Sequence, residues 1–85
     1  PKPETARENY KKALTDWECI RREIENKRKS GKNVSADTES GLFIEILNRN
    51  GFKTFEEFNV IDVELRKDEA FAKQFDADLK KVPCN

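Results

Sequence analysis

Two cysteines are the residues of this sequence best able to do covalent chemistry. Cys19 and Cys84 are the only cysteines in a chain of 85 residues, and they stand 65 positions apart. This spacing has no CxxC character, and two thiolates alone are too few for a four-ligand zinc site. The residues alone leave two alternatives, a Cys19–Cys84 disulfide or two unpaired thiols.

Other residue types that do chemistry are missing or unsuitably spaced. The sequence has no histidine, so it offers no imidazole to shuttle protons, to activate a serine or cysteine, or to bind a metal. Carboxylates are abundant, but Asp62 and Glu64, like Asp76 and Asp78, lie two positions apart, where helical side chains diverge. The three glycines are dispersed and do not form a phosphate-binding loop. We therefore expect no catalysis, no metal and no cofactor.

A basic cluster is the one feature that suggests an anionic partner. Its members are Arg21, Arg22, Lys27, Arg28, Lys29 and Lys32. Cations at the end of a helix also complement the helix dipole, which explains the cluster without a phosphate partner. The chain as a whole contains 17 Lys and Arg against 17 Asp and Glu, whereas nucleic-acid-binding domains usually carry a basic excess. We therefore expect no nucleic-acid partner.

The first helix must position Cys19 and most of this cluster. Thr5 and Glu8 have the spacing of a capping box, which predicts a helix from near Thr5 to about Lys29, with Gly31 just beyond its end. Its apolar residues recur at spacings of three and four positions. On a helical wheel Cys19 lies roughly 140° from this apolar stripe, on the outer edge of the helix.

Three shorter amphipathic helices are expected after a polar loop. Their predicted caps are Ser35 or Asp37, then Thr54, and then Asp68. The third of the four helices contains several β-branched residues, so we expect it to be short or kinked near Asn59. The predicted fold is all-α, a small bundle of about four helices with a long first helix and one disulfide. Residues 1–4 would form an N-terminal linker and residues 5–85 a single helical domain.

A small aromatic core is predicted from the spacing of the large apolar residues. Only 35% of the residues are hydrophobic and 40% are charged, but six phenylalanines supply bulky apolar volume. The predicted core residues are Tyr10, Trp17, Ile20, Ile24, Phe43, Ile46, Leu47, Phe55, Phe58, Phe71, Phe75 and Leu79.

The pattern of cysteines and turns resembles a known type of domain. Cys19 in a long first helix, the turn 50–58 (NGFKTFEEF), the segment 68–71 (DEAF) and the last-turn Cys84 resemble the small helical domains of bacterial lipoproteins, including spirochaete ones. The resemblance covers residues 10–85. It implies a Cys19–Cys84 disulfide and an exported domain beyond an acylated N-terminal linker, with no known activity. The residues themselves also favour the disulfide, because the tail after the last helix can fold over a neighbouring helix.

A second resemblance is to FF domains, which are intracellular protein-binding modules. It is carried by Phe43, by the turn at Gly51 and Phe52, and by Phe71. The chain departs from that family because it lacks the tryptophan of the second helix.

The leading functional hypothesis is a non-catalytic exported module that binds another protein, as a periplasmic, surface or secreted inhibitor or an exclusion-type lipoprotein domain. Membrane contact would come only through a removed or acylated N-terminal anchor. The alternatives are an intracellular helical module that binds nucleic acid or, like FF domains, protein, and a carrier of a small apolar ligand in the phenylalanine-rich interior. The sequence leaves the oligomeric state open.

Overall fold

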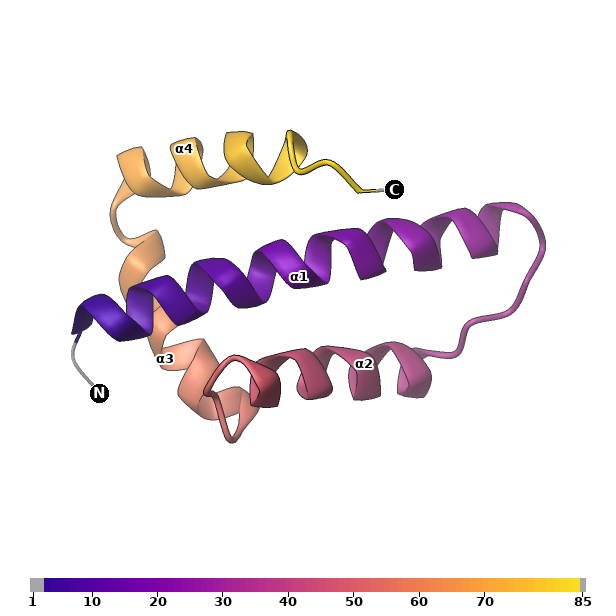
Figure 1. The fold of residues 1–85 in the computed structure, drawn as a ribbon, viewed down its shortest axis with the longest axis horizontal. Helices are drawn as coiled ribbons and strands as arrows, with labels where there is room; N and C mark the ends of the chain where they lie inside the picture. The colour runs from indigo at the N-terminus through magenta and orange to yellow at the C-terminus, as the bar shows by residue number, and fades with distance from the viewer. Residues whose placement is uncertain (1–2, 85) are drawn as a thin grey trace.

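The long first helix lies between the other helices of the bundle (Figure 1). The computed structural model describes residues 3–84. Within these residues all regular structure is helical, and the order is α1 (Pro3–Lys29), α2 (Ala36–Arg49), α3 (Phe55–Arg66) and α4 (Glu69–Lys80). The predicted all-α bundle with a long first helix is confirmed.

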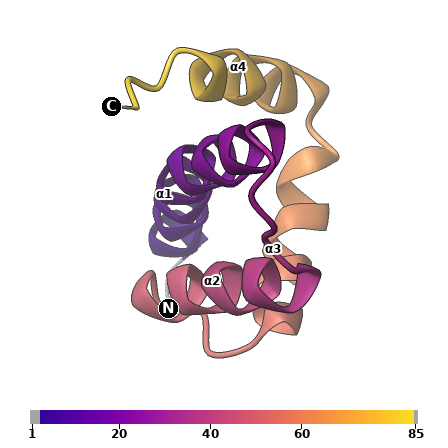
Figure 2. The same cartoon turned by 90° about the vertical axis from the view of Figure 1, so that its right-hand side faces the viewer.

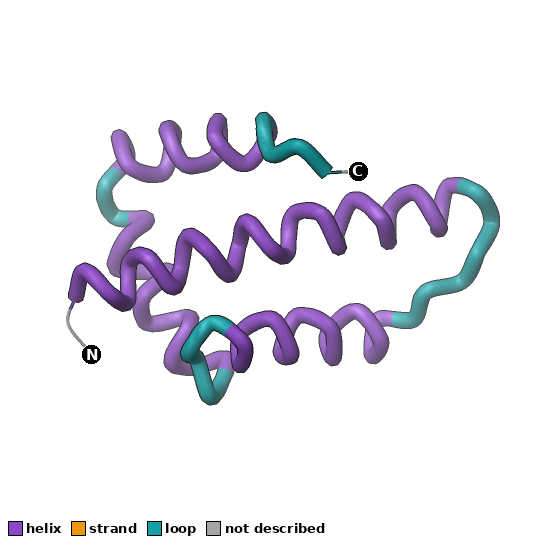
Figure 3. The backbone as a smooth tube through the Cα atoms, viewed as in Figure 1, coloured by secondary structure: helices purple, strands orange, loops and turns teal. Residues whose placement is uncertain are grey.

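The arrangement places α1 in contact with every other helix. In Figure 1, α2 runs antiparallel to α1 on one side and α4 runs in the same direction as α1 on the other. Figure 2 shows α3 crossing from α2 to α4. Among the described residues α2 and α4 do not contact each other, so they are held together through α1 and α3. The connection 30–35 between α1 and α2 makes a long excursion at one end of the molecule (Figure 3).

The caps of the last three helices follow from side chains that replace missing helical hydrogen bonds. The side chains of Ser35, Thr54 and Asp68 each accept a hydrogen bond from the backbone N–H three residues later, at 3.1, 3.2 and 3.1 Å. Of the two candidates for α2, the cap is therefore Ser35 and not Asp37. α3 continues without a break through Asn59, and with 12 residues it is one of the two shortest helices, in line with the expectation of a short helix.

The start of α1 differs from the prediction. The helix begins at Pro3, two residues before Thr5, so Thr5 lies inside the helix and is not its cap. A proline is well suited to the first turn, because its fixed φ is helical and its missing N–H would have no partner there. Pro3 and Glu4 therefore belong to α1 and not to a linker, while residues 1–2 lie outside the described residues.

A glycine turn at the end of α2 brings one more phenylalanine into the core. Gly51 has a φ of +90°, and the N–H of Phe52 donates to the carbonyl of Leu47 at 2.9 Å. These features define a Schellman motif, which directs the following apolar residue back onto the helix. Phe52 is accordingly only 6% exposed, although its position outside any helix kept it out of the predicted core.

Most of the predicted core residues pack together. Tyr10, Ile24, Ile46, Leu47, Phe58 and Phe75 are buried. Trp17, Ile20, Phe43, Phe71 and Leu79 are partly buried and pack against the buried cluster. Phe55 is the exception, because at the first position of α3 it borders Phe43 and Phe58, at 6.4 and 6.3 Å between ring centroids, but stays 46% exposed. Its assignment to the core was wrong.

Tyr10 joins three helices at the centre of this core. Its ring lies 5.3 Å from that of Phe58 in α3 and 5.8 Å from that of Phe75 in α4, measured between ring centroids. Its hydroxyl donates a hydrogen bond to Asp62 and accepts one from Nε of Arg66 at 3.0 Å. Burial, together with the hydrogen bond to Asp62, raises the pKa of Tyr10 from 10.0 to about 12.

This pKa is directly measurable because Tyr10 is the only tyrosine. Titration of tyrosinate absorbance in the folded protein should give a midpoint near pH 12 rather than near 10.0. A phenol whose pKa is raised by folding contributes stability below its unfolded pKa, and this contribution is lost as the pH rises toward the folded pKa. Between these pH values the free energy of unfolding should therefore fall by roughly 2 kcal/mol more in the wild type than in Tyr10→Phe. A tyrosinate midpoint near 10 in the folded protein would contradict the buried placement.

Candidate functional site: the disulfide and its surroundings

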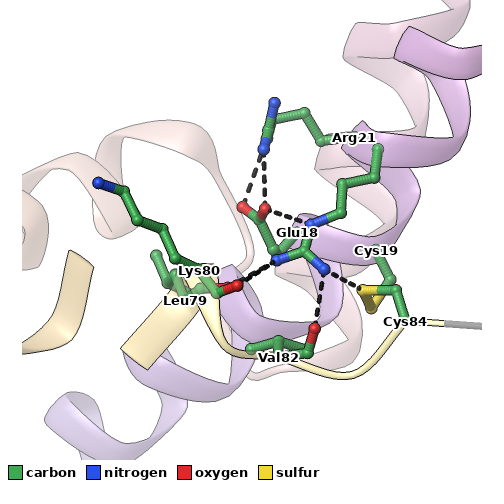
Figure 4. The surroundings of a disulfide bond; sticks show 8 residues. Glu18, Cys19, Arg21, Leu79, Lys80, Val82 and Cys84 are labelled. Atoms are coloured by element: carbon green, nitrogen blue, oxygen red, sulfur yellow. Dashed lines mark hydrogen bonds and ion pairs between the residues drawn. A yellow bond between two sulfur atoms is a disulfide. The ribbon is translucent and has the colours of Figure 1, made fainter. Parts of the chain in front are cut away.

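The two cysteines form a disulfide between α1 and the C-terminal tail (Figure 4). Cys19 and Cys84 are bonded, with their Cα atoms 5.3 Å apart, and no free cysteine exists. α4 ends at Lys80, and the tail then returns to the outer edge of α1. The predicted disulfide is confirmed, and the alternative of two unpaired thiols is wrong. The bond is compatible with an oxidising compartment.

Arg22 holds the tail beside this disulfide. Its guanidinium donates to the carbonyl oxygens of Leu79 and Val82, both at 2.8 Å. Leu79 lies in the last turn of α4, where its carbonyl also accepts from the N–H of Val82 at 3.2 Å, while Val82 lies in the tail beyond the helix. The guanidinium therefore adds a cap at the C-terminus of α4. The same group donates to Sγ of Cys84 at 3.3 Å. Arg22 therefore acts within the fold and is not a free member of a basic patch.

Glu18 orients this arginine. Its carboxylate accepts hydrogen bonds from Nε of Arg22 at 2.8 Å and from Nη2 of Arg21 at 2.7 Å, and its side chain is only 12% exposed. The hydrogen bond from Arg21 is the main cause that holds the pKa of Glu18 below its usual value. Glu18 was not among the predicted site residues, although its spacing of three and four residues from the two arginines is the usual signal of helical ion pairs.

The rest of the basic cluster is also largely neutralised by neighbouring carboxylates. Lys27 pairs with Glu23 and Lys29 with Glu25, both at 3.4 Å. Arg28 pairs with Glu39 of α2 at 2.8 Å and so links the two helices. Lys32 is exposed in the loop after α1. The cluster therefore lies on a surface where acids and bases alternate, and it does not present a continuous positive field.

Two surface grooves lie beside the disulfide. The disulfide groove, of about 410 Å³, is lined by both cysteines and by a mainly polar set of neighbours that includes Arg22, Glu23 and Lys27. The α1–α2 groove, of about 420 Å³, is lined by Cys19 but not by Cys84. Its apolar lining residues are Ile20, Leu42, Ile46 and Val82. Cys19 therefore borders both grooves, and Cys84 borders only the disulfide groove.

A second candidate surface is the outer side of α3, far in sequence from the cysteines. Val60 is 66% exposed and Val63 is 51% exposed. Val60 lies three or four positions from each of Glu56, Glu57 and Glu64, which are all exposed, so the valines and glutamates share one helix face. We refer to these five residues as the α3 face. The α3 face was not among the predicted sites. Its signal in the sequence is that the two valines are not part of the set Phe58, Ile61 and Leu65, which packs in or against the core.

Neither a metal site nor a membrane span is found in residues 3–84. No group of three or more His, Cys, Asp or Glu side chains is placed there to hold a metal ion. None of the helices in this range is both long and apolar enough to cross a membrane. Comparison of the chain with protein-family models, with curated proteins and with solved structures finds no match.

The contribution of the disulfide to stability can be measured by removing both sulfur atoms. The Cys19→Ser/Cys84→Ser variant should lose up to roughly 4 kcal/mol of unfolding free energy in urea, because the bond limits the freedom of the unfolded chain. Wild-type protein denatured under reducing conditions is the matched control and should lose a similar amount. A double variant as stable as the oxidised wild type would show that the hydrogen bonds of Arg22 hold the tail without help.

The neutralised basic cluster should bind nucleic acid weakly or not at all. At ~150 mM salt, fluorescence anisotropy of labelled duplex and single-stranded DNA should show no saturable binding. The Glu23→Gln/Glu25→Gln variant removes two of the neutralising carboxylates and should bind more tightly than the wild type at low salt. Tight binding by the wild type with a steep salt dependence would contradict this prediction.

Proposed function

We propose that this protein is a non-catalytic, exported protein-interaction module that binds its partner through the α3 face. The observation that supports this most strongly is the exposure of Val60 and Val63, which are 66% and 51% exposed in a chain with few hydrophobic residues. Exposed apolar side chains surrounded by charged ones are typical of protein-binding surfaces. A helix that only covered a core would carry polar residues at these two positions.

The charges around the valines indicate the chemistry of the partner. Val60 has three glutamates among its near neighbours on the helix, which are Glu56, Glu57 and Glu64. One of these, Glu64, pairs with Lys67 at 3.4 Å, in a contact whose two side chains are about 70% exposed and which a partner could replace. A complementary surface would present an apolar side chain bordered by lysine or arginine. We therefore propose a protein partner with a basic, apolar docking segment.

Export is supported by the disulfide. Disulfides persist in oxidising compartments and are rare where cellular thiols keep cysteines reduced. A domain with 40% charged residues and a small core also gains more from such a bond than a larger domain does. A periplasmic, surface or secreted location, with or without a lipid anchor, is part of this proposal.

The alternative functions receive less support from the same contacts. The ion pairs of the basic cluster disfavour a nucleic-acid partner, because counterion release needs cations that are free to meet phosphates. The aromatic rings of the core contact one another, as Phe58 does with Tyr10, Phe43 and Phe52, which leaves little interior space for a small apolar ligand. The carboxylates of Asp62 and Asp76 are both bound by Arg66, which disfavours acid–base catalysis by them.

A peptide selection tests this proposal, because it does not require the natural partner. Peptides are selected from a random display library on the folded, oxidised wild-type protein. We expect the enriched peptides to combine apolar residues with lysine or arginine. Their affinity for Val60→Ser/Val63→Ser should fall at least about tenfold, since two contacts at the centre of an interface are removed.

The matched control is Ile44→Ser, which removes an exposed aliphatic side chain from α2. Ile44 is 36% exposed and lies outside the α3 face. Peptide affinity for this variant should equal that for the wild type, and circular dichroism should show that both variants fold. Enrichment of acidic peptides, or equal binding to Val60→Ser/Val63→Ser, would contradict the proposal.

A further inference from the structure

We propose that the Cys19–Cys84 disulfide is a thiol–disulfide exchange site for a protein dithiol, in which Cys19 is attacked and Cys84 is the leaving group. This inference goes beyond the proposed docking function and does not depend on it. It rests on the asymmetry between the two sulfur atoms. Sγ of Cys84 accepts a hydrogen bond from Arg22 at 3.3 Å, whereas among the described residues no hydrogen bond reaches Sγ of Cys19.

The guanidinium of Arg22 is placed to stabilise negative charge on Cys84. When the disulfide bond breaks, the departing sulfur becomes a thiolate, and a cation in hydrogen-bond contact lowers the pKa of such a thiol. A leaving thiol of lower pKa departs faster. The two hydrogen bonds from Arg22 to the carbonyls of Leu79 and Val82 keep the tail, and therefore Cys84, beside the guanidinium.

Access to the two sulfurs shows the same asymmetry. An incoming thiolate attacks one sulfur from the side opposite the bond that breaks. Cys19 lines both the α1–α2 groove and the disulfide groove, whereas Cys84 lines the disulfide groove alone, so Cys19 is the cysteine that a thiolate bound in the α1–α2 groove would meet. The groove is about 420 Å³ and is partly apolar, which suits the short peptide segment that carries the cysteines of a protein dithiol.

The exchange takes place in two steps, in which every bond formed is matched by a bond broken. A thiolate of the dithiol forms a bond to Sγ of Cys19, the Cys19–Cys84 bond breaks, and the electron pair remains on Sγ of Cys84. The second thiol of the dithiol, once deprotonated, then attacks the mixed disulfide and releases Cys19 as a thiolate. In total the dithiol is oxidised to a disulfide, and the two cysteines of this chain receive two electrons and two protons.

Neighbouring charges affect the stability of the thiolate that forms on Cys84. The charged side chains that contact Arg22 or line the disulfide groove are Glu18, Glu23 and Lys27. Glu18 partly offsets the charge of Arg22, because it accepts from Nε of that residue at 2.8 Å. The two terminal nitrogens still point toward the tail, and one of them contacts the sulfur. The environment of Cys84 is therefore cationic at short range.

The first test is the rate at which dithiothreitol, a small dithiol, reduces the native protein. Arg22→Gln should be reduced more slowly than the wild type, by roughly threefold for each unit by which the pKa of the leaving thiol rises. Arg21→Gln is the matched control, because Arg21 also pairs with Glu18 but is not in contact with either sulfur. Its reduction rate should equal that of the wild type. Reduction of Arg22→Gln as fast as or faster than the wild type would overturn the proposal.

The second test is a pKa, which a purely structural role of Arg22 would not change. In Cys19→Ser the pKa of the single thiol, measured from the pH dependence of its alkylation, should lie about one unit below the ordinary ~8.5. It should return to that value in Cys19→Ser/Arg22→Gln. An ordinary pKa in Cys19→Ser would show that Arg22 does not stabilise the thiolate, and the proposal would fail.

The third test identifies the sulfur that is attacked. The native protein is exposed briefly to a monothiol, and an excess of a fast alkylating reagent is then added, which quenches the monothiol and captures the released cysteine. Peptide mass spectrometry should find the monothiol on Cys19 and the alkyl group on Cys84. The reverse labelling, or equal labelling of both cysteines, would overturn the proposed direction of attack.

Discussion

The packing of Tyr10 is the interaction on which the bundle depends most. α2 and α4 do not contact each other within the described residues, so their relative placement is set by α1 and α3. Tyr10 of α1 meets Phe58 of α3 and Phe75 of α4, and its hydroxyl binds Asp62 and Arg66. A single fully buried side chain therefore supplies both aromatic packing and a satisfied polar network at this junction.

A second attachment fixes the direction of α4. Tyr10 and Cys19 lie nine residues apart on α1, which is roughly 14 Å along a helix. α4 is held near its middle by Phe75 against Tyr10, and its tail is held by Arg22 and the disulfide at Cys19. Two attachments along one line prevent α4 from rotating about either of them. The disulfide and the aromatic core therefore act together, although they share no residue.

The sequence predicted local features well and non-local ones less well, with the Cys19–Cys84 disulfide as the main non-local feature that it did predict. Caps such as Thr54 and Asp68 depend on neighbours three residues away, so they can be identified from spacing alone. Phe52 and Phe55 were misjudged because helical periodicity does not describe a turn, nor does it show how far the end of a helix is covered by its neighbours. Arg22 was assigned to a basic cluster, and its bonds to residues about 60 positions away could not be inferred from its surroundings in the sequence.

The position of the disulfide also determines what a protease could release from this protein. Cys19 lies in the middle of α1, so the covalent ring contains the second half of α1, together with α2, α3 and α4, and leaves out the first half of α1. The longest connection between helices in this ring is the segment 30–35, whose residues are mostly exposed. A single cut there would produce two polypeptides that remain joined, since one carries Cys19 and the other carries Cys84. The cleaved molecule would keep its mass, apart from one added water, until a reductant separated the two pieces.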